Sequence, residues 1–173
     1  PTVMIVSDLA VFLEKHAHPT LKVKIIEKST CMLALRKAVH CTAISDYTKQ
    51  TMIRYFHIPP SKITVTPLAV MSKTLHPTGQ KIVASRYHLP KRYILFVGTL
   101  EPRKNIENLL EAYARLPKAL ISVVPLILVG QRGWNTKGID EYIKRYRLEK
   151  SVREIGFVSD SDLPAVYQLA TVF

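Results

Sequence analysis

The second half of the chain alternates short strand-like runs that end in glycine with longer segments of helical periodicity. The three runs are YILFV, LILV and VREI, and they end at Gly98, Gly130 and Gly156. Parallel strands can be joined only by a crossover connection, which is usually a helix. The pattern therefore predicts a β-α-β-α-β-α unit built on a parallel sheet.

The segments between these runs carry apolar stripes at the spacing i, i+3, i+4, i+7. After the first run, Asn105 is the expected N-cap of a helix that Pro117 stops. The three stripes are Ile106, Leu109, Leu110 and Tyr113; Ile139, Tyr142, Ile143 and Tyr146; and Leu163, Val166, Tyr167 and Ala170. Each stripe predicts a helix that packs on the sheet.

The first half shows a weaker version of the same alternation. We expect strands at 3–6, 41–44 and 63–65, a long helix near 20–38, and a helix capped by Ser45 that runs to Phe56. Residues 67–90 contain prolines and a glycine without clear periodicity, which is typical of a connector. The expected division is therefore residues 1–72, a connector at 73–90, and residues 91–173.

Composition narrows the class of protein. With 173 residues, of which 47% are hydrophobic and 22% charged, the chain can form packed cores and is not expected to be disordered. No apolar run approaches the roughly 18 residues of a membrane-spanning helix, and the start lacks a signal segment, so a cytoplasmic protein is expected. Cys31 and Cys41 are isolated and the six histidines show no ligand spacing. Neither disulfides nor a metal site is expected.

The formal net charge of +12 favours partners rich in phosphate. Residues 1–90 carry 12 basic and 4 acidic side chains, whereas residues 91–173 carry 13 and 9. The first half is therefore the expected contact for an anionic membrane surface, with peripheral association at its inner face. A merely solvated basic face is the competing interpretation. Nucleic acid is a disfavoured partner, because no known nucleic-acid-binding motif accompanies the charge.

Four stretches of the chain resemble glycosyltransferase family four, also called group one. They are AISDYTKQTMIRYFHIPPSKITVTPLAV at 43–70, ILFVGTLEPRKNIENLLEAY at 94–113, LILVGQRGW at 126–134 and IGFVSDSDLPAVYQLATVF at 155–173. The resemblance implies an α/β fold of the GT-B type, with two Rossmann-like domains and parallel sheets. Residues 1–72 would be the C-terminal part of the acceptor domain and residues 91–173 the first half of the donor-binding domain.

Arg103 and Lys104 lie immediately before an expected helix N-terminus, where positive charge and backbone N–H groups favour a bound diphosphate. Taken alone, such a pair is more often part of a solvated loop. The resemblance assigns Arg103 and Lys104, together with Gly98 and Thr99, to the site for the donor diphosphate. Thr99 stands where many members of the family have arginine, so the site has one cation fewer.

The resemblance also assigns nucleotide-binding and catalytic positions. Gly130 and the segment Gly156, Phe157 and Val158 would bind the nucleotide, although Gly130 also fits a simple strand-to-turn glycine. Ser7 replaces a histidine that faces the sugar in the family, and a hydroxyl cannot supply the proton chemistry of an imidazole. Asp8 would orient the site, or it is only a turn residue. Trp134 is a candidate sugar contact, whereas Tyr142 and Tyr146 are expected in the core.

The activity implied by the resemblance is transfer of a hexose, such as mannose or glucose, from a nucleoside diphosphate sugar to a glycan or lipid-linked acceptor with retention. The donor substrate is the only small molecule expected, without a further cofactor. Both domains are expected to be incomplete, so we expect the chain alone to show no transfer. Two other hypotheses remain: a non-catalytic nucleotide-sugar-binding relative, supported by Ser7 and Thr99, and a basic nucleic-acid-binding domain.

Overall fold

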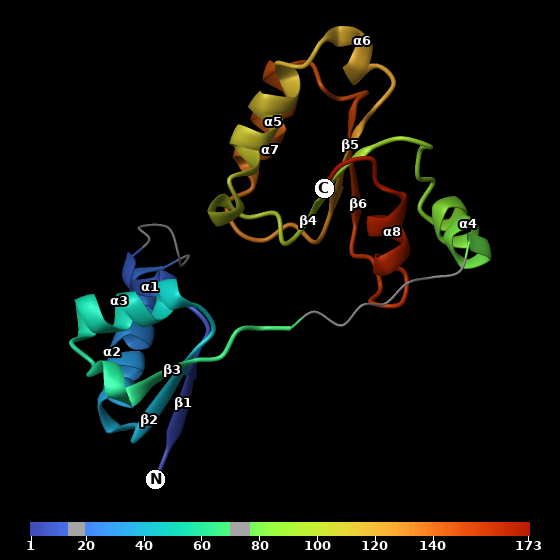
Figure 1. The fold of residues 1–173 in the computed structure, drawn as a ribbon. Helices are drawn as coiled ribbons and strands as arrows, with labels where there is room; N and C mark the ends of the chain where they lie inside the picture. The colour runs from blue at the N-terminus through green and yellow to red at the C-terminus, as the bar shows by residue number, and fades with distance from the viewer. Residues whose placement is uncertain (14–19, 70–76) are drawn as a thin grey trace. The chain divides into compact units, whose positions relative to one another are not determined.

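A computed structural model describes residues 1–13, 20–69 and 77–173 of the chain (Figure 1). The chain divides into two compact units, unit 1 at Pro1–Met71 and unit 2 at Ser72–Phe173. Each unit is an α/β assembly around its own three-stranded parallel sheet. The predicted α/β class with two parallel sheets is therefore confirmed.

The sheet of unit 1 has the order β1 (Val3–Val6), β2 (His40–Ala43) and β3 (Ile63–Val65). The β2 strand thus begins and ends one residue before the predicted 41–44. The helical elements are α1 (Ala10–Leu13), α2 (Leu21–Lys37), α3 (Asp46–Phe56) and the 3-10 turn η1 (Pro60–Lys62). Ser45 caps α3 as predicted, since its hydroxyl accepts a hydrogen bond from the Thr48 backbone N–H at 3.1 Å.

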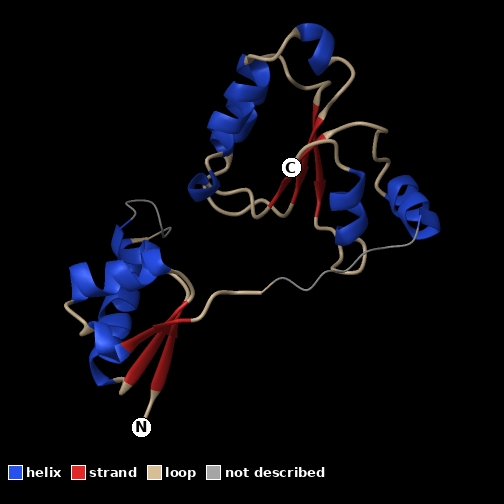
Figure 2. Ribbon diagram, viewed as in Figure 1, coloured by secondary structure: helices blue, strands red, loops and turns tan. Residues whose placement is uncertain are grey.

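The core of unit 1 lies on one face of its sheet, where Figure 2 shows the helices. Strand side chains alternate between the two faces, so Val6 is buried while Ile5 is 73% exposed. Leu35 of α2 and Met52 of α3 lie in one buried cluster with Val6 of β1 and Cys41 of β2. The opposite face of this sheet carries no described helix.

The sheet of unit 2 has the order β4 (Ile94–Val97), β5 (Leu126–Val129) and β6 (Val152–Gly156). The helical elements are α4 (Pro77–Arg86), the 3-10 turn η2 (Pro102–Lys104), α5 (Ile106–Ala114), α6 (Lys118–Ile121), α7 (Lys137–Arg145) and α8 (Leu163–Leu169). The three predicted strands and the three predicted helices of this half are all present. Their alternation explains why each strand end leads directly into a loop and a helix.

Both faces of the unit 2 sheet are covered, which is why its central strand β5 is a continuous apolar run. All four residues of β5 are buried. Leu126 and Leu128 pack into the cluster formed with α5 and α7, whereas Ile127 and Val129 pack with α4 and α8 on the other face. The central strand is thereby fixed from two sides, and its carboxyl end is held in place for the loops that follow.

The chain returns after α8 to the free edge of β4. Val172 forms a parallel bridge with Ile94, the Leu95 N–H donates to the Val172 carbonyl at 2.8 Å, and the Thr171 N–H donates to the Tyr93 carbonyl at 2.9 Å. Strand order therefore reverses beside β4: β5 lies on one side of it and residue 172 on the other. In open α/β sheets, ligands bind at the carboxyl ends of the strands at this point of reversal.

The expected connector at 73–90 is largely helical, because α4 spans Pro77–Arg86. Its Val83 is 3% exposed and belongs to the unit 2 core, against which Tyr87 also packs. The sequence pattern missed this helix because its apolar positions are few and Ile82, 56% exposed, does not continue a stripe. Residues 70–76, which contain the expected boundary at 72, lie outside the described residues.

A buried carboxylate ties α4 to the start of α8. Asp162 accepts a hydrogen bond from the Arg86 guanidinium at 2.6 Å and another from the Tyr87 hydroxyl at 3.0 Å. Burial acts to raise the pKa of Asp162, but the hydrogen bonds from Arg86 and Tyr87 hold it below its ordinary value. The ionised form is therefore the one that the folded state stabilises.

Acid should weaken unit 2 through this carboxylate. The pKa of Asp162 is lower in the folded state than in the unfolded state, so its ionised carboxylate contributes fully to the free energy of unfolding above the unfolded pKa of about 3.9. This contribution is lost as pH falls through the lower folded pKa. We expect Asp162→Asn to destabilise the protein near pH 7 and to have a smaller effect at pH 3. Urea unfolding at a series of pH values measures this, and parallel pH profiles for the two proteins would contradict it.

Candidate functional site

Three glycines bring the carboxyl ends of the unit 2 strands together. The Gly98 N–H donates to the Val129 carbonyl at 2.9 Å, and the Gly130 N–H donates to the Gly156 carbonyl at 2.8 Å. A Cβ at Gly130 would lie 2.1 Å from the Gly98 carbonyl oxygen. Glycine is therefore required at position 130 by the neighbouring backbone, whatever ligand also approaches there.

Lys104 lies over the end of β4. Its Cε would be 3.8 Å from a Cβ placed on Gly98, and its side chain is exposed. No ion pair or hydrogen bond of the Lys104 ammonium occurs among the described residues. The structure thus places an available positive charge at the point where strand order reverses, beside Gly98 and the exposed Thr99.

Arg103 is less available than Lys104. Its Nε and one terminal nitrogen both lie 3.1 Å from the Glu101 Oε1, and its side chain is 38% exposed. The sequence interpretation assigned both Arg103 and Lys104 to the diphosphate site, with Lys104, directly before Asn105, as the firmer of the two. The structure distinguishes them, because one of the two is already paired with a carboxylate.

The helix start at Asn105 differs from the simple N-cap that the sequence suggests. Asn105 holds the N-cap position of α5, but its side chain makes no capping hydrogen bond and its φ is 55°, in the left-handed region. Asparagine tolerates this conformation better than most residues. The reason is the preceding turn η2, since the Asn105 N–H donates to the Pro102 carbonyl at 3.0 Å. The turn directs Lys104 back toward β4.

The loop after β5 is attached to the loop after β4. The Leu100 N–H donates to the Gln131 carbonyl and the Gly133 N–H donates to the Leu100 carbonyl, both at 2.9 Å. A Cβ on Gly133 would lie 3.0 Å from the Thr99 Cγ2. The two loops therefore act as one backbone layer beneath the exposed Thr99 and Lys104.

Arg132 fixes this layer to the rest of unit 2. Its guanidinium donates to both carboxylate oxygens of Asp140 at 2.6 and 2.7 Å, and to both oxygens of Glu154 at 2.6 and 2.8 Å. These hydrogen bonds, first those to Asp140 and then those to Glu154, raise the pKa of Arg132, and they lower the pKa of Asp140. One side chain thus joins the β5 loop to α7 and β6.

Sequence reasoning missed Arg132. Two signals could have indicated it: an arginine two positions after the glycine that ends β5, and Glu154, a charged residue within the otherwise strand-like run VREI. An acidic side chain on a strand can form an ion pair with a basic side chain of the loop beside it. The partner here is contributed by the neighbouring loop.

Replacing Arg132 with Met should lower the free energy of unfolding by about 1 to 2 kcal/mol, because it leaves Asp140 and Glu154 without their common partner. Arg115→Met is the matched control. Within the described part of the chain, the Arg115 guanidinium makes an exposed i, i+4 pair with Glu111 and no other ion pair, so its loss should cost less than about 0.5 kcal/mol. Chemical denaturation of both variants measures the difference, and equal losses would show that the Arg132 network adds nothing to stability.

The segment after β6 lies at the same edge of the sheet. Gly156 has φ 71°, Phe157 is 66% exposed, and Val158 is 4% exposed and packs in the core. Because the Val158 side chain points into the core, only its main chain is left for a ligand. Trp134 in the β5 loop is half-buried. Tyr142 and Tyr146 pack against the core, which confirms their expected role.

The candidate residues of unit 1 follow β1. Ser7 and Asp8 are exposed, and Leu9 beside them is buried. The Ser7 carbonyl accepts a hydrogen bond from the Thr48 hydroxyl at 3.4 Å, which links the end of β1 to the first turn of α3. Unit 1 therefore holds Ser7 and Asp8 at the carboxyl edge of its own sheet.

Neither a metal cluster nor a membrane span is found within the described ranges. No group of three His, Cys, Asp or Glu residues in residues 1–13, 20–69 and 77–173 could hold a metal ion. His16, His18 and His76 lie outside these ranges. None of the described helices is long and apolar enough to cross a bilayer.

Two of the solved structures that share the fold serve as examples. The first is the Anabaena protein Alr3699/HepE in complex with UDP-glucose, with a TM-score of 0.72 and 21% identity; the match covers 98% of this chain and 45% of that chain. The second is a sucrose-phosphate synthase from Thermosynechococcus elongatus, with a TM-score of 0.72 and 18% identity; the match covers 97% of this chain and 42% of that chain. At this level of identity the likeness shows the fold alone. It confirms the expected partial GT-B architecture.

Curated relatives are closer in sequence. The chain is 36% identical over 169 residues to the O-antigen chain mannosyltransferase B of Escherichia coli, covering 96% of this chain and 44% of that protein. It is 31% identical over 139 residues to the serotype-specific mannosyltransferase WbdA of Escherichia coli, with 76% and 17% covered. The chain thus spans less than half the length of these relatives. A family model described as glycosyl transferases group 1 matches residues 81–173. The chain therefore belongs to the group 1 glycosyltransferases.

Proposed function

We propose that the protein takes part in transfer of mannose from a nucleoside diphosphate sugar to a growing glycan or lipid-linked acceptor, with retention at the anomeric carbon. The family membership and the names of the two mannosyltransferases support the reaction class and the sugar. The observation that carries the site is Lys104, an available cation beside Gly98 at the reversal of strand order. An O-antigen-like polysaccharide is the acceptor class that the relatives suggest.

In this proposal unit 2 binds the donor and unit 1 belongs to the acceptor side. When the bond from the anomeric carbon to the diphosphate breaks, negative charge grows on the phosphate oxygens. Lys104 stabilises that charge, and Arg103 adds to it when its guanidinium turns from Glu101 to the phosphate. The backbone layer of Gly98, Gly130 and Gly133 supports these side chains because its hydrogen bonds hold it in place before the ligand arrives.

The remaining candidates have narrower roles. The main chain of Gly156, Phe157 and Val158 meets the nucleotide base, and the exposed Phe157 ring can stack on it. In unit 1, the Ser7 hydroxyl hydrogen-bonds the sugar and Asp8 orients the acceptor side. A serine cannot take up a proton at neutral pH, so this chain relies on charge stabilisation of the leaving group more than on proton transfer.

Calorimetric titration with GDP, UDP, ADP and the corresponding nucleosides tests the proposal. We expect one diphosphate to bind and its nucleoside to bind at least 10-fold more weakly, because the diphosphate makes the contacts with Lys104. The preferred base identifies the donor class. Failure of all three diphosphates to bind would overturn the donor-site assignment.

A non-catalytic relative is the second candidate, and Ser7 in place of the family histidine is the observation that favours it. Binding of a nucleotide sugar without turnover fits both this candidate and our expectation that the 173-residue chain alone does not transfer sugar. A transfer assay on a protein extended to the length of the relatives separates the two. Turnover there supports the enzyme, and tight binding without turnover supports the non-catalytic relative.

A further inference from the structure

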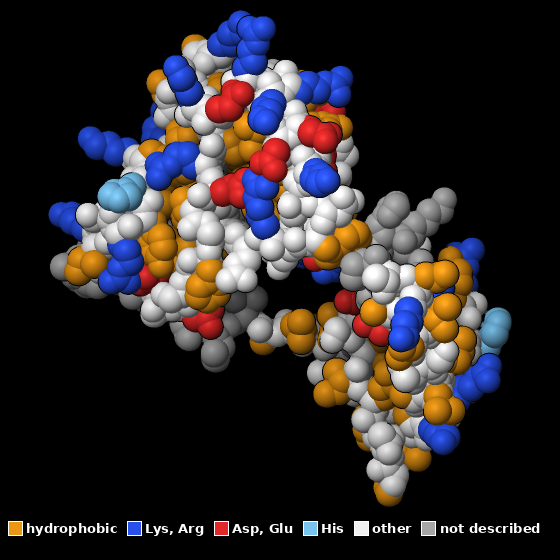
Figure 3. Space-filling model, turned by 180° about the vertical axis from the view of Figure 1, so that it is seen from behind, with side chains coloured by type: hydrophobic (Ala, Val, Ile, Leu, Met, Phe, Trp, Pro, Cys, Tyr) orange, Lys and Arg blue, Asp and Glu red, His pale blue; other side chains and the backbone are white. Residues whose placement is uncertain are grey.

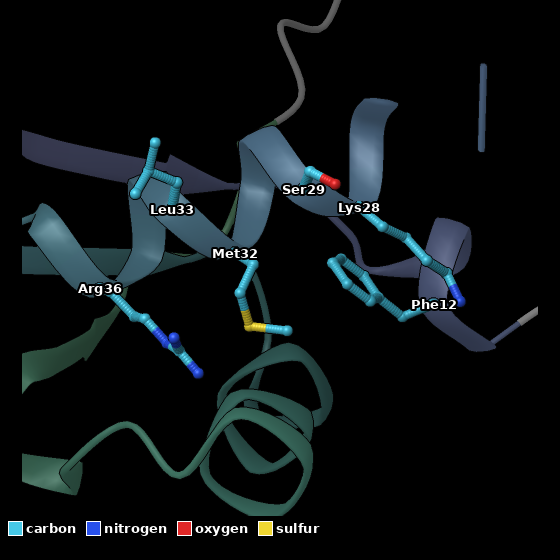
Figure 4. A pocket seen from close by; sticks show the side chains of 6 residues that line it. All are labelled: Phe12, Lys28, Ser29, Met32, Leu33 and Arg36. Carbon is cyan, nitrogen blue, oxygen red and sulfur yellow. The ribbon is translucent and has the colours of Figure 1, made fainter. Parts of the chain in front are cut away.

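An open pocket of unit 1 contains no feature that identifies a ligand. It lies between α2 and Phe12 of α1, and its volume is about 500 Å³. Figure 4 shows the side chains that line it, of which Lys28 and Arg36 are charged. Within the described ranges, no buried side-chain nitrogen or oxygen lacks a hydrogen-bond partner, so the pocket holds no buried polar group that a ligand would have to satisfy. The geometry that points to a further role lies in unit 2.

Arg132 differs from the other ion-paired arginines of unit 2 because it joins three elements. Figure 3 shows that Lys and Arg lie among Asp and Glu over the visible face of this unit. In the described part of the unit, three arginines each pair with one carboxylate, namely Arg86, Arg103 and Arg115. Arg132 instead pairs from the β5 loop with Asp140 of α7 and with Glu154 of β6, each at 2.6 Å. Its guanidinium is therefore held in one place from two directions.

The backbone of Arg132 is joined to the loop that carries the proposed diphosphate residues. Arg132 forms a parallel bridge with Leu100, which directly follows Thr99. Backbone hydrogen bonds of 2.9 Å between Leu100 and residues 131 and 133 close this bridge. The Arg132 side chain, in contrast, reaches β6, the strand that leads to the proposed base-binding segment at 156–158. One residue thus connects the two halves of the proposed donor site.

The β6 strand contains a bulge directly after Glu154. Residues 128 and 129 of β5 are consecutive but lie opposite Glu154 and Gly156, so Ile155 is an extra residue in β6. Such an insertion bends a strand and re-aims the residues that follow it. Regular contact resumes at once, since the Gly130 N–H donates to the Gly156 carbonyl at 2.8 Å. The bulge therefore sets the direction in which the chain leaves the sheet.

The proposed base-binding segment is anchored at both of its ends. Gly156 has a φ of 71°, and the next two side chains point to opposite sides, because Phe157 is 66% exposed and Val158 is 4% exposed. The Val158 side chain packs in the core and anchors the far end of the segment. The near end is anchored through Glu154, which accepts two hydrogen bonds from the Arg132 guanidinium at 2.6 and 2.8 Å.

We propose that Arg132 is a positioning residue for recognition of the nucleotide base. Its guanidinium holds Glu154 against the β5 loop, and so keeps the bulge at Ile155 and the main chain of 156–158 at the place where the base binds. A bidentate pair between a guanidinium and a carboxylate suits this role, because its planar geometry fixes orientation as well as distance. The inference rests on the proposed function, since it requires the donor nucleotide to bind at this edge of the sheet.

Calorimetric titration of Arg132→Met with GDP, UDP, ADP and inorganic pyrophosphate tests this role. We expect the preference of the protein for its best base over the other two to fall about 10-fold, which corresponds to the loss of one hydrogen bond to the base. Affinity for pyrophosphate should stay the same, because Lys104 is still in place. Lys104→Ala should give the opposite pattern, with weaker binding of pyrophosphate and of all three nucleotides and an unchanged preference. General destabilisation would weaken all three nucleotides equally and would leave the preference unchanged.

Three further variants locate the effect. Glu154→Met should lower the base preference as Arg132→Met does, whereas Asp140→Met should leave it unchanged, because the pair between Arg132 and Glu154 remains. Arg153→Met is the matched control for charge, since Arg153 is the neighbouring residue of β6 and its guanidinium donates to the His88 carbonyl at 2.9 Å. A base preference that survives in Arg132→Met, or that falls equally in Arg153→Met or Asp140→Met, would overturn the proposal.

Amide hydrogen exchange of the free protein separates failure of this proposal from failure of the donor site. In Arg132→Met the Gly130 N–H, which donates to the Gly156 carbonyl beside the bulge, should exchange faster. The Leu95 N–H, which donates to the Val172 carbonyl at 2.8 Å, should exchange as before. Unchanged exchange at Gly130 would overturn the positioning role even if nucleotides bind. If none of the three nucleotides binds to the protein without substitutions, the donor site fails, and the role in base recognition fails with it.

Discussion

Gly130→Ala is expected to lower the free energy of unfolding by about 4 kcal/mol, close to the whole stability of many small domains. Two effects combine. The new Cβ would lie 2.1 Å from the Gly98 carbonyl oxygen and 2.7 Å from the Gly98 carbonyl carbon, so one of the two strand ends must move. The φ of 138° is also one that residues with a side chain rarely adopt.

Gly156→Ala provides the control, because it changes the equivalent glycine of the neighbouring strand. Its φ is 71°, but no atom lies within 4 Å of the new Cβ. Only the free-energy cost of placing a residue with a side chain in the left-handed conformation remains, about 1 to 2 kcal/mol. Urea unfolding of both variants measures the contrast. Similar losses for the two would show that close approach to Gly98 does not determine the residue at position 130.

Lys104→Ala is expected to weaken binding of the preferred nucleoside diphosphate by about 10- to 100-fold, the loss of one hydrogen bond between charged groups. Arg103→Ala should have a smaller effect, because Glu101 already pairs with the Arg103 guanidinium at 3.1 Å. By the same reasoning Glu101→Gln should tighten binding, since it frees Arg103 and removes a negative charge. The double change of Arg103 and Lys104 to Ala should abolish measurable binding.

Lys118→Ala is the matched control for these titrations. Lys118 is exposed and begins α6, which leads into the amino end of β5 and so lies at the opposite end of the strands. The net charge falls equally in both variants, but affinity should change little in the control. If Lys118→Ala weakened binding as much as Lys104→Ala, the effect would be one of overall charge, and the donor site would have to be sought elsewhere.

The sequence predicts the strands of unit 2 well because each is bounded by a glycine and lies between covered faces. β5 is the clearest case, since all its residues are apolar and buried. The sequence predicts α4 poorly. This helix contributes Val83 to a core shared with distant strands, and it shows little apolar periodicity of its own. Helix propensity and the spacing of apolar residues report local structure, whereas the position of α4 depends on its contact with the start of α8.

The candidate site likewise has some features that the sequence predicts and others that it does not. Gly98, Thr99 and Lys104 are found at the strand end where the sequence puts them, although their binding role remains a prediction. The pairing of Arg103 with Glu101 could not be read from the sequence, because two charges two residues apart pair only when the chain turns as it does in η2. Arg132 escaped notice because its partners, Asp140 and Glu154, follow it in other elements.

The return of the chain to the edge of β4 has a consequence for how unit 2 folds. The bridge between Ile94 and Val172 joins the first strand of the unit to residues that are made after β5, β6 and α8. Contacts so distant in sequence form slowly, because the loop between them must be closed first. The β4 strand therefore gains its second neighbour last, at its amino end. Because Lys104 lies in the loop that follows this strand, nucleotide binding should appear only in the final phase of refolding.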